Sequence, residues 1–176
     1  DVYVNGVLAA NDFRFREATR FLDVPAGMPI EVSLAPGTST GVDEAIASFT
    51  RTLSDGQVLF AMATGPSDLS SSDSGVQLVT HPAARMESTV PDVAQLFFAH
   101  GSPDAPAVQI WIKERGALGG MGEISYGNTS GHGHVVPGPQ TVEVRSGGAA
   151  LASYEVDWSP LTGAAGVLVA SGLVSS

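Results

Sequence analysis

The sequence predicts an all-β protein made of two tandem antiparallel β-sandwich domains. Glycine (21 residues) and proline (11 residues) are plentiful, and they separate short runs that contain Val, Ile and Phe. Such runs, bounded by turn-forming residues, are typical of strands in sandwiches. No Gly- or Pro-free stretch of about 11 residues keeps an apolar stripe at helical spacing. The segment 42–53 comes closest, but it alternates at Ala45, Ala47 and Phe49, so we predict a strand there.

An internal repeat indicates two domains. The stretch "VPAGMPIEV" (24–32) matches "VPGPQTVEV" (136–144), and "DVYV" (1–4) falls on "QIWI" (109–112). Two units of about seven short strands each fit tandem sandwiches. We therefore predict a first domain over residues 1–80, a linker over 81–92 and a second domain over 93–176.

Further elements follow from local composition. The Ser- and Asp-rich segment 65–75 is expected to be a loop. The alternating segment 76–81 and the apolar segment 93–100 are predicted strands, and residues 82–92 between them are expected to be irregular. The segment 54–65 corresponds in the repeat to 160–172, and each is predicted to contain a strand.

The two halves differ at their first strand. In the second half, "AQLFFAHGSPDAPAVQIWI" (94–112) supplies a strand, a proline-braced turn and an aromatic strand, whereas the first half begins at the aromatic strand. A sandwich without that strand leaves backbone N–H and C=O groups unpaired at an edge. We expect this edge to be covered by residues preceding Asp1, by segment 76–80, or by a strand from a neighbouring molecule.

The motif around residue 100 has a structural interpretation. In "LFFAH", Leu96, Phe98 and His100 alternate with residues on the other face of the strand. The prolines that follow restrict the backbone, and Asp104 is suited to accept backbone N–H bonds in a turn. We predict a brace for the reversal of the chain, with ligand binding by His100 and Asp104 as the alternative.

These residues carry a family resemblance. "AHGSPDAPAV" (99–108), "DVYVNG" (1–6) and "VPAG" followed by "IEV" resemble a family of secreted bacterial and archaeal repeats known as domain of unknown function 4397. The resemblance covers most of the chain as two copies, the first without its N-terminal strand. It implies an Ig-like sandwich that is exported to the cell surface or the medium. It implies no catalytic residues.

Charge excludes several kinds of partner. The net charge is −10, with one lysine and seven arginines, and no basic stripe interleaves with aromatic residues. Nucleic acid is therefore not an expected partner, and anionic membrane surfaces should repel the chain.

No apolar run reaches the roughly 18 residues that a membrane-spanning helix needs. Cysteine is absent, so disulfides and thiolate chemistry are excluded.

The sharpest candidate for metal binding is "HGH". His132 and His134 lie two residues apart, so a strand would direct both side chains to one face, where they could bind Zn²⁺ or Cu²⁺ with a third ligand such as His100 or Asp104. The corresponding residues of the first half are Arg20 and Leu22, so the pair is not part of the repeat. We expect exposed polar histidines, and we predict no resident cofactor.

Three aromatic residues are candidates for ligand binding. Tyr154 and Trp158 are four residues apart on one predicted strand, which would place them on the same face, and Trp111 is a further candidate. Such a strip is a possible carbohydrate platform, although core packing explains it as simply.

The sequence favours a non-enzymatic protein. No nucleophile elbow or phosphate-binding glycine motif is present. Our leading hypothesis is an extracellular or cell-surface structural or adhesive module, including a filament-like subunit that uses strand complementation. Its partners would be protein neighbours, including further copies of the chain, at edge strands or loops. The alternatives are a module that binds polysaccharide or another ligand and, more remotely, a metal-binding protein.

Overall fold

The structure, a computed structural model, describes residues 1–65 and 75–174. The expected loop 65–75 lies almost entirely outside this range. The strands are β1 (Val2–Val4), β2 (Val7–Ala10), β3 (Pro29–Leu34), β4 (Ala47–Thr52), β5 (Phe60–Thr64), β6 (Gln77–His81), β7 (Ala94–Gly101), β8 (Gln109–Ile112), β9 (Gly116–Ala117), β10 (Gly133–Val135), β11 (Pro139–Ser146), β12 (Ala149–Asp157) and β13 (Ala165–Ser171). Three single-turn 3₁₀ segments join them: η1 (Val42–Glu44), η2 (Leu118–Gly120) and η3 (Ser159–Leu161). The prediction of an all-β sandwich fold is confirmed.

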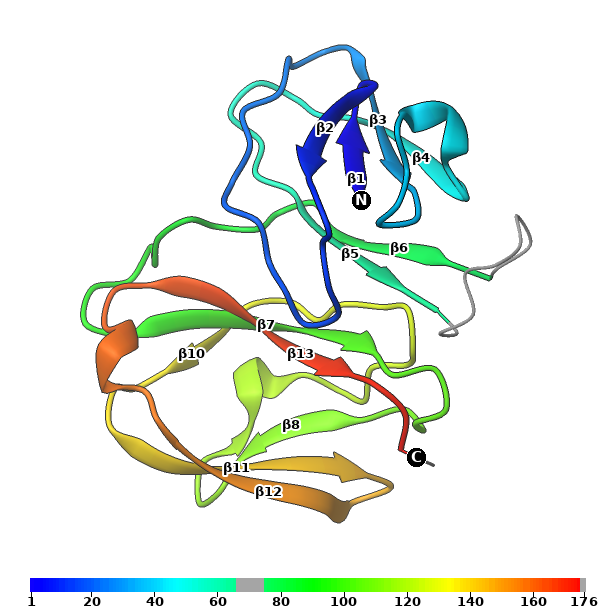
Figure 1. Cartoon of the computed structure of the whole chain (residues 1–176). Coiled ribbons are helices and arrows are strands. Elements are labelled where there is room, and N and C mark those ends of the chain that lie inside the picture. Colours follow the sequence, from blue (N-terminus) through cyan, green and yellow to red (C-terminus); the bar gives the residue numbers. More distant parts are fainter. Residues whose placement is uncertain (66–74, 175–176) are drawn as a thin grey trace.

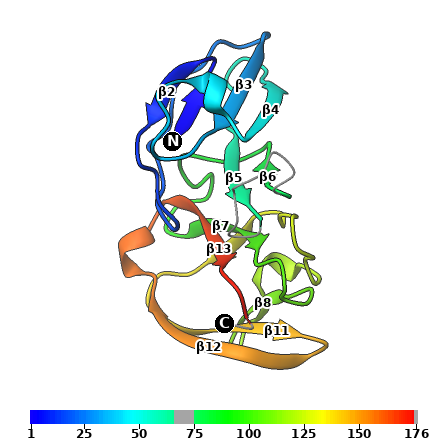
Figure 2. The ribbon, with the colours of Figure 1, turned by 45° about the vertical axis from the view of Figure 1, so that its right-hand side comes forward.

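The strands form four sheets that are stacked as layers (Figure 1). From the N-terminal end of the stack, their strand orders are β2-β1-β3-β4, β5-β6, β10-β7-β13 and β12-β11-β8-β9. The two outer sheets share one strand order. If the four strands of each sheet are numbered along the chain, they lie across the sheet in the order second, first, third, fourth, which for the C-terminal sheet is β9-β8-β11-β12. The rotated view keeps the same order of layers (Figure 2).

Two tight turns show how the sequence sets the hairpins of the outer sheets. Asn5 and Gly6 join β1 to β2 with φ of 50° and 77°, and Gly147 and Gly148 join β11 to β12 with φ of 56° and 83°. Positive φ at both central residues is the geometry of the two-residue turn that matches strand twist, and Asn-Gly and Gly-Gly tolerate it best.

A hydrophobic core lies in the C-terminal half of the chain (β7 to β13), between the β10-β7-β13 and β12-β11-β8-β9 sheets. Leu96 and Phe98 of β7 face Ile110 and Ile112 of β8, and all four side chains are buried. Leu118, in the long connection after β8, is 2% exposed and belongs to the same core. That connection approaches β10 closely, because a Cβ on Gly133 would lie 2.6 Å from the backbone nitrogen of Gly119.

The N-terminal half is covered less completely. Val2 and Val4, which the predicted repeat aligns with Ile110 and Ile112, are only half-buried. The predicted repeat aligns β5 with β13, yet β13 pairs in parallel with β7, whereas β5 pairs in antiparallel fashion with β6. We expected segment 76–80 as one of three candidates to cover the unpaired edge of the first sandwich. In the structure residues 77–80 of this segment belong to β6, which pairs with β5.

One predicted strand is partly wrong. Residues 42–44 form a 3₁₀ turn, and the strand begins only at Ala47. The Glu44 carboxylate accepts hydrogen bonds from the backbone N–H (2.6 Å) and the hydroxyl (2.8 Å) of Thr40, and these bonds close a turn that an extended backbone could not form. The predicted strands at 76–81 and 93–100 are confirmed as β6 and β7, within a residue at their ends.

Candidate functional site

Strand β7 is the centre of the molecule, because it is buried on both faces. All eight of its residues are buried. Leu96, Phe98 and His100 face the C-terminal core, as the alternation predicted, while Phe97 on the other face contacts the β5-β6 hairpin. A strand at the middle of two packed layers must be apolar on both sides, and the uninterrupted run "LFFA" satisfies that requirement.

The contact between the β5-β6 hairpin and β7 is a cluster of four rings, which we call the central interface: Phe60, His81, Phe97 and His132. The imidazole of His81 stacks on Phe97, with ring centroids 4.2 Å apart and an angle of 16° between the planes. Phe60 and His132 meet the same ring edge-on, at 5.3 and 5.4 Å. Four residues beyond Phe60 and Phe97 along their strands, the Thr64 hydroxyl donates a hydrogen bond of 2.8 Å to the carbonyl of Gly101 at the end of β7.

The two histidines of the central interface face each other. Their ring centroids are 5.1 Å apart, and His81 is only 8% exposed. Nδ1 of His81 lies 3.1 Å from the hydroxyl of Thr129, but the buried Nε2 atoms of His81 and His132 have no hydrogen-bond partner among the residues that the structure describes. Burial, together with the nearby Arg85 guanidinium, holds the pKa of both imidazoles below the usual value, and for His132 the neighbouring His81 adds to the effect.

A polar network borders the central interface. The buried amide oxygen of Gln95 accepts hydrogen bonds from Arg85 Nη1 (2.9 Å) and from the backbone N–H of Thr89 (2.8 Å). The amide nitrogen of Gln95 therefore points the other way and donates to Nε2 of His134 at 2.8 Å. The segment 82–92 is thus tied to both β7 and β10.

The four residues of the metal hypothesis do not converge. His132 and His134 do face the same side of β10, as predicted, but His100 lies on the opposite, core face of β7. The Nε2–H of His100 donates to the carbonyl of Pro106 (3.0 Å), and its Nδ1 accepts from the backbone N–H of Ser102 (3.4 Å), so both nitrogens are engaged. Within residues 1–65 and 75–174, no three His, Asp or Glu side chains are grouped closely enough to hold a metal ion.

The turn after β7 is bonded to the segment that follows β13, whereas the sequence predicted a brace within the turn itself. Ser102 Oγ donates a 2.6 Å hydrogen bond to the carbonyl of Gly172. The Asp104 carboxylate accepts the backbone N–H of Val174, at 2.9 and 3.1 Å to its two oxygens. Through these bonds the turn holds the segment that follows β13.

The three aromatic candidates for ligand binding are also dispersed. Trp158 lies beyond the end of β12 and is 4% exposed, packed in the core, so the expectation that it shares an exposed strand face with Tyr154 is wrong. Tyr154 is 56% exposed and lies opposite Val142, whereas Trp111 lies opposite Glu143. Adjacent residues of a strand point to opposite faces, so Trp111 and Tyr154 are on different sides of the sheet.

Trp111 lies on the outer, polar face of the C-terminal sheet. The Arg145 guanidinium is 4.6 Å from the centre of the Trp111 ring and forms an ion pair of 2.7 Å with Glu143. Alongside is an open groove of about 450 Å³, lined by Lys113, Glu114, Arg115, Pro139, Gln140, Thr141 and Glu155.

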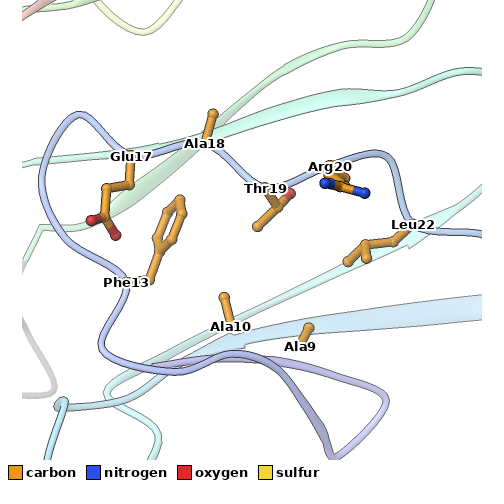
Figure 3. A pocket seen from close by; sticks show the side chains of 8 residues that line it. All are labelled: Ala9, Ala10, Phe13, Glu17, Ala18, Thr19, Arg20 and Leu22. Carbon is orange, nitrogen blue, oxygen red and sulfur yellow. The ribbon is translucent and has the colours of Figure 1, made fainter.

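A second groove, of about 580 Å³, lies in the N-terminal half between β2 and the segment that follows it (Figure 3). Ala9 and Ala10 form one side, and Phe13, Thr19 and Leu22 lie across from them. No sequence motif pointed to this groove. The same segment reaches β13, where the Arg16 guanidinium donates to the hydroxyl (3.3 Å) and the carbonyl (3.4 Å) of Ser171.

Sequence reasoning missed the central interface. The "HGH" motif identified His132 as unusual, but nothing marked His81 as its neighbour, since His81 begins the predicted linker and His132 lies in the predicted second domain. The position of His81 at the end of the predicted strand 76–81 did not point to His132, because His100 ends the predicted strand 93–100 in the same way.

Comparison with known proteins gives one match. A family model described as a domain of unknown function (DUF4397) matches residues 1–111, which extends from β1 into β8 and includes β7 and its turn. No curated protein and no solved structure matches the chain. No helix in residues 1–65 and 75–174 is both long and apolar enough to cross a membrane.

Proposed function

Since the chain belongs to the DUF4397 family, a domain of unknown function, we propose a role from its architecture: a non-enzymatic structural or adhesive module of an extracellular or cell-surface protein or assembly. In this proposal the protein works as a stiff spacer. It presents loops and sheet edges to protein neighbours at a defined separation and orientation.

The central interface is the observation that carries this proposal. Two sandwiches joined only by a linker would move independently, because interfaces between domains are by default small and polar. Here the β5-β6 hairpin instead packs its aromatic face on a fully buried strand of the other half. The Arg16–Ser171 hydrogen bonds link the halves at a second place. Two separate points of attachment oppose both bending and twisting between the halves.

The edge of β12 supports a role in assembly. Of the strands that the structure describes, β12 is the longest, with nine residues, and it pairs only with β11. Its Leu151 and Tyr154 are more than half exposed. An unpaired edge offers backbone N–H and C=O groups to a strand of another chain. We propose this edge as the contact for a protein neighbour, including a further copy of the chain.

The test uses the natural protein in its own cells. Antibodies raised against this chain should label intact cells or detect the protein in the medium, and cross-linking on intact cells should join it to neighbours through peptides of β12. Leu151→Lys should reduce those cross-links, because a lysine on an edge strand blocks strand pairing. Met86→Lys changes a residue of similar exposure outside any strand and should leave them intact. Labelling confined to permeabilised cells would overturn the proposed location, and unchanged cross-links in Leu151→Lys would overturn the role of β12.

A second candidate function is favoured by the groove beside Trp111. A half-buried indole next to a groove lined by charged and amide side chains resembles a polysaccharide-binding surface in its chemistry. Affinity electrophoresis through gels that contain soluble polysaccharides tests it. Trp111→Ala should abolish any retardation, whereas Tyr154→Ala, on the other side of the sheet, should leave it unchanged. Equal retardation of the wild type and Trp111→Ala would rule out this site.

A further inference from the structure

The central interface contains two histidines that come from different parts of the chain. His81 comes from the β5-β6 hairpin, and His132 precedes β10 in the other half, so the 5.1 Å contact between their rings spans the boundary between the halves. Within residues 1–65 and 75–174, both buried Nε2 atoms lack a hydrogen-bond partner. Buried polar atoms are normally satisfied, so a pair of unsatisfied imidazole nitrogens at one contact is unusual.

The surroundings of the pair oppose a positive charge. The groups that face it are the rings of Phe60 and Phe97, the hydroxyl of Thr129, the guanidinium of Arg85 and, across Gln95, the imidazole of His134. The electrostatic effects on the pair come from Arg85 and, for His132, also from His81, and each opposes protonation. A proton on either ring would add a partly buried cation beside Arg85, and no acidic side chain in the described part of the chain acts on the pair as a counter-ion.

We infer that the His81–His132 contact makes the central interface acid-sensitive: a proton taken up by either imidazole releases the β5-β6 hairpin from β7. In the released state both rings reach water, and the charge is solvated. Loss of this contact frees one of the two attachments between the halves. The Arg16–Ser171 attachment remains, so the expected result of acid is a hinged molecule, with both halves folded.

The direction of the pH dependence follows from linkage. The pKa of each histidine is lowered in the closed state, and a solvent-exposed histidine titrates near pH 6.5. The released state therefore binds more protons below about pH 6.5, so the closed state is fully favoured above that pH and loses stability as pH falls through it. For each histidine that takes up one proton on release, the equilibrium constant for release increases by up to about tenfold for each unit by which the pH falls.

Hydrogen exchange measured by mass spectrometry on the whole chain tests the inference. Between pH 8 and pH 5, after correction for the intrinsic exchange rate, peptides covering β5 and β6 should exchange at least about tenfold faster, while peptides covering β8 and β11 should not change. The variant His81→Phe/His132→Phe keeps aromatic rings at both positions and should show no acceleration. The control His134→Asn retains an acceptor for Gln95 and should behave as the wild type.

Acceleration that persists in the double variant, or exchange of β5 and β6 that does not depend on pH in the wild type, would overturn the inference. If the double variant fails to fold, the ring protons of His81 and His132 in the wild type provide a second measurement by NMR. Their titration should coincide with chemical-shift changes of Phe60 and Phe97. Histidines that titrate without any change at those two phenylalanines would equally overturn it.

Discussion

Adjacent phenylalanines on β7 allow the two roles of this strand to be separated. Phe97 is 3% exposed and faces the β5-β6 hairpin, and Phe98 is 1% exposed and faces the C-terminal core. The two side chains have the same size and nearly the same burial. Truncation to alanine should therefore cost a similar free energy, about 3–5 kcal/mol, from lost transfer energy and the cavity that remains.

The two substitutions should destabilise different parts of the molecule. Phe98→Ala removes a side chain from the core of the C-terminal half, so that half should unfold at a temperature lower by about 6–20 °C, taking 2–4 °C for each kcal/mol in a chain of this size. Phe97→Ala removes the ring on which His81 stacks and which Phe60 and His132 meet edge-on. This substitution should therefore weaken the packing of one half on the other, and it should change the stability of the C-terminal core little.

Differential scanning calorimetry distinguishes these outcomes. The wild type should give one transition, because the central interface couples the halves. Phe97→Ala should give two transitions, the first from the incompletely covered N-terminal half, with the C-terminal transition changed little. Phe98→Ala should lower the main transition. A single transition for Phe97→Ala at the wild-type temperature would refute the argument that this interface couples the halves, and two transitions in the wild type would show that it never did.

Two further predictions concern the C-terminal half. Gly133→Ala should destabilise the protein by about 1–3 kcal/mol in denaturant unfolding, because the added Cβ would clash with backbone 2.6 Å away at Gly119. Gly131→Ala, which meets no atom within 4 Å, is the matched control, and equal stabilities would contradict the close packing of η2 on β10. Trp158→Ala should cost about 3–5 kcal/mol, because the ring is buried in the core. Tyr154→Ala should change stability by less than about 0.5 kcal/mol, and a reversed order of these two effects would show that their burial is misassigned.

Local sequence determined the elements where backbone chemistry is decisive. Asn-Gly and Gly-Gly specify the hairpins after β1 and β11, and the alternation of "LFFAH" gives the two faces of β7. The all-β class followed from glycine and proline placed between short β-branched and aromatic runs. The predicted strand at 42–53 failed at its start because the side chain of Glu44 closes a turn, an interaction that competes with alternation of apolar residues.

Tertiary structure alone decided which chemical groups meet. The contact between His81 and His132 requires that the β5-β6 hairpin pack on β7, and no local pattern encodes that docking. The register of β11 against β8 and β12 separates Trp111 from Tyr154, since a shift of one residue exchanges the faces of a sheet. Trp158 is buried because the chain leaves the strand at Asp157 and turns into the core. Periodicity along the chain predicts which side of a strand a residue occupies, whereas only packing between sheets determines what lies opposite it.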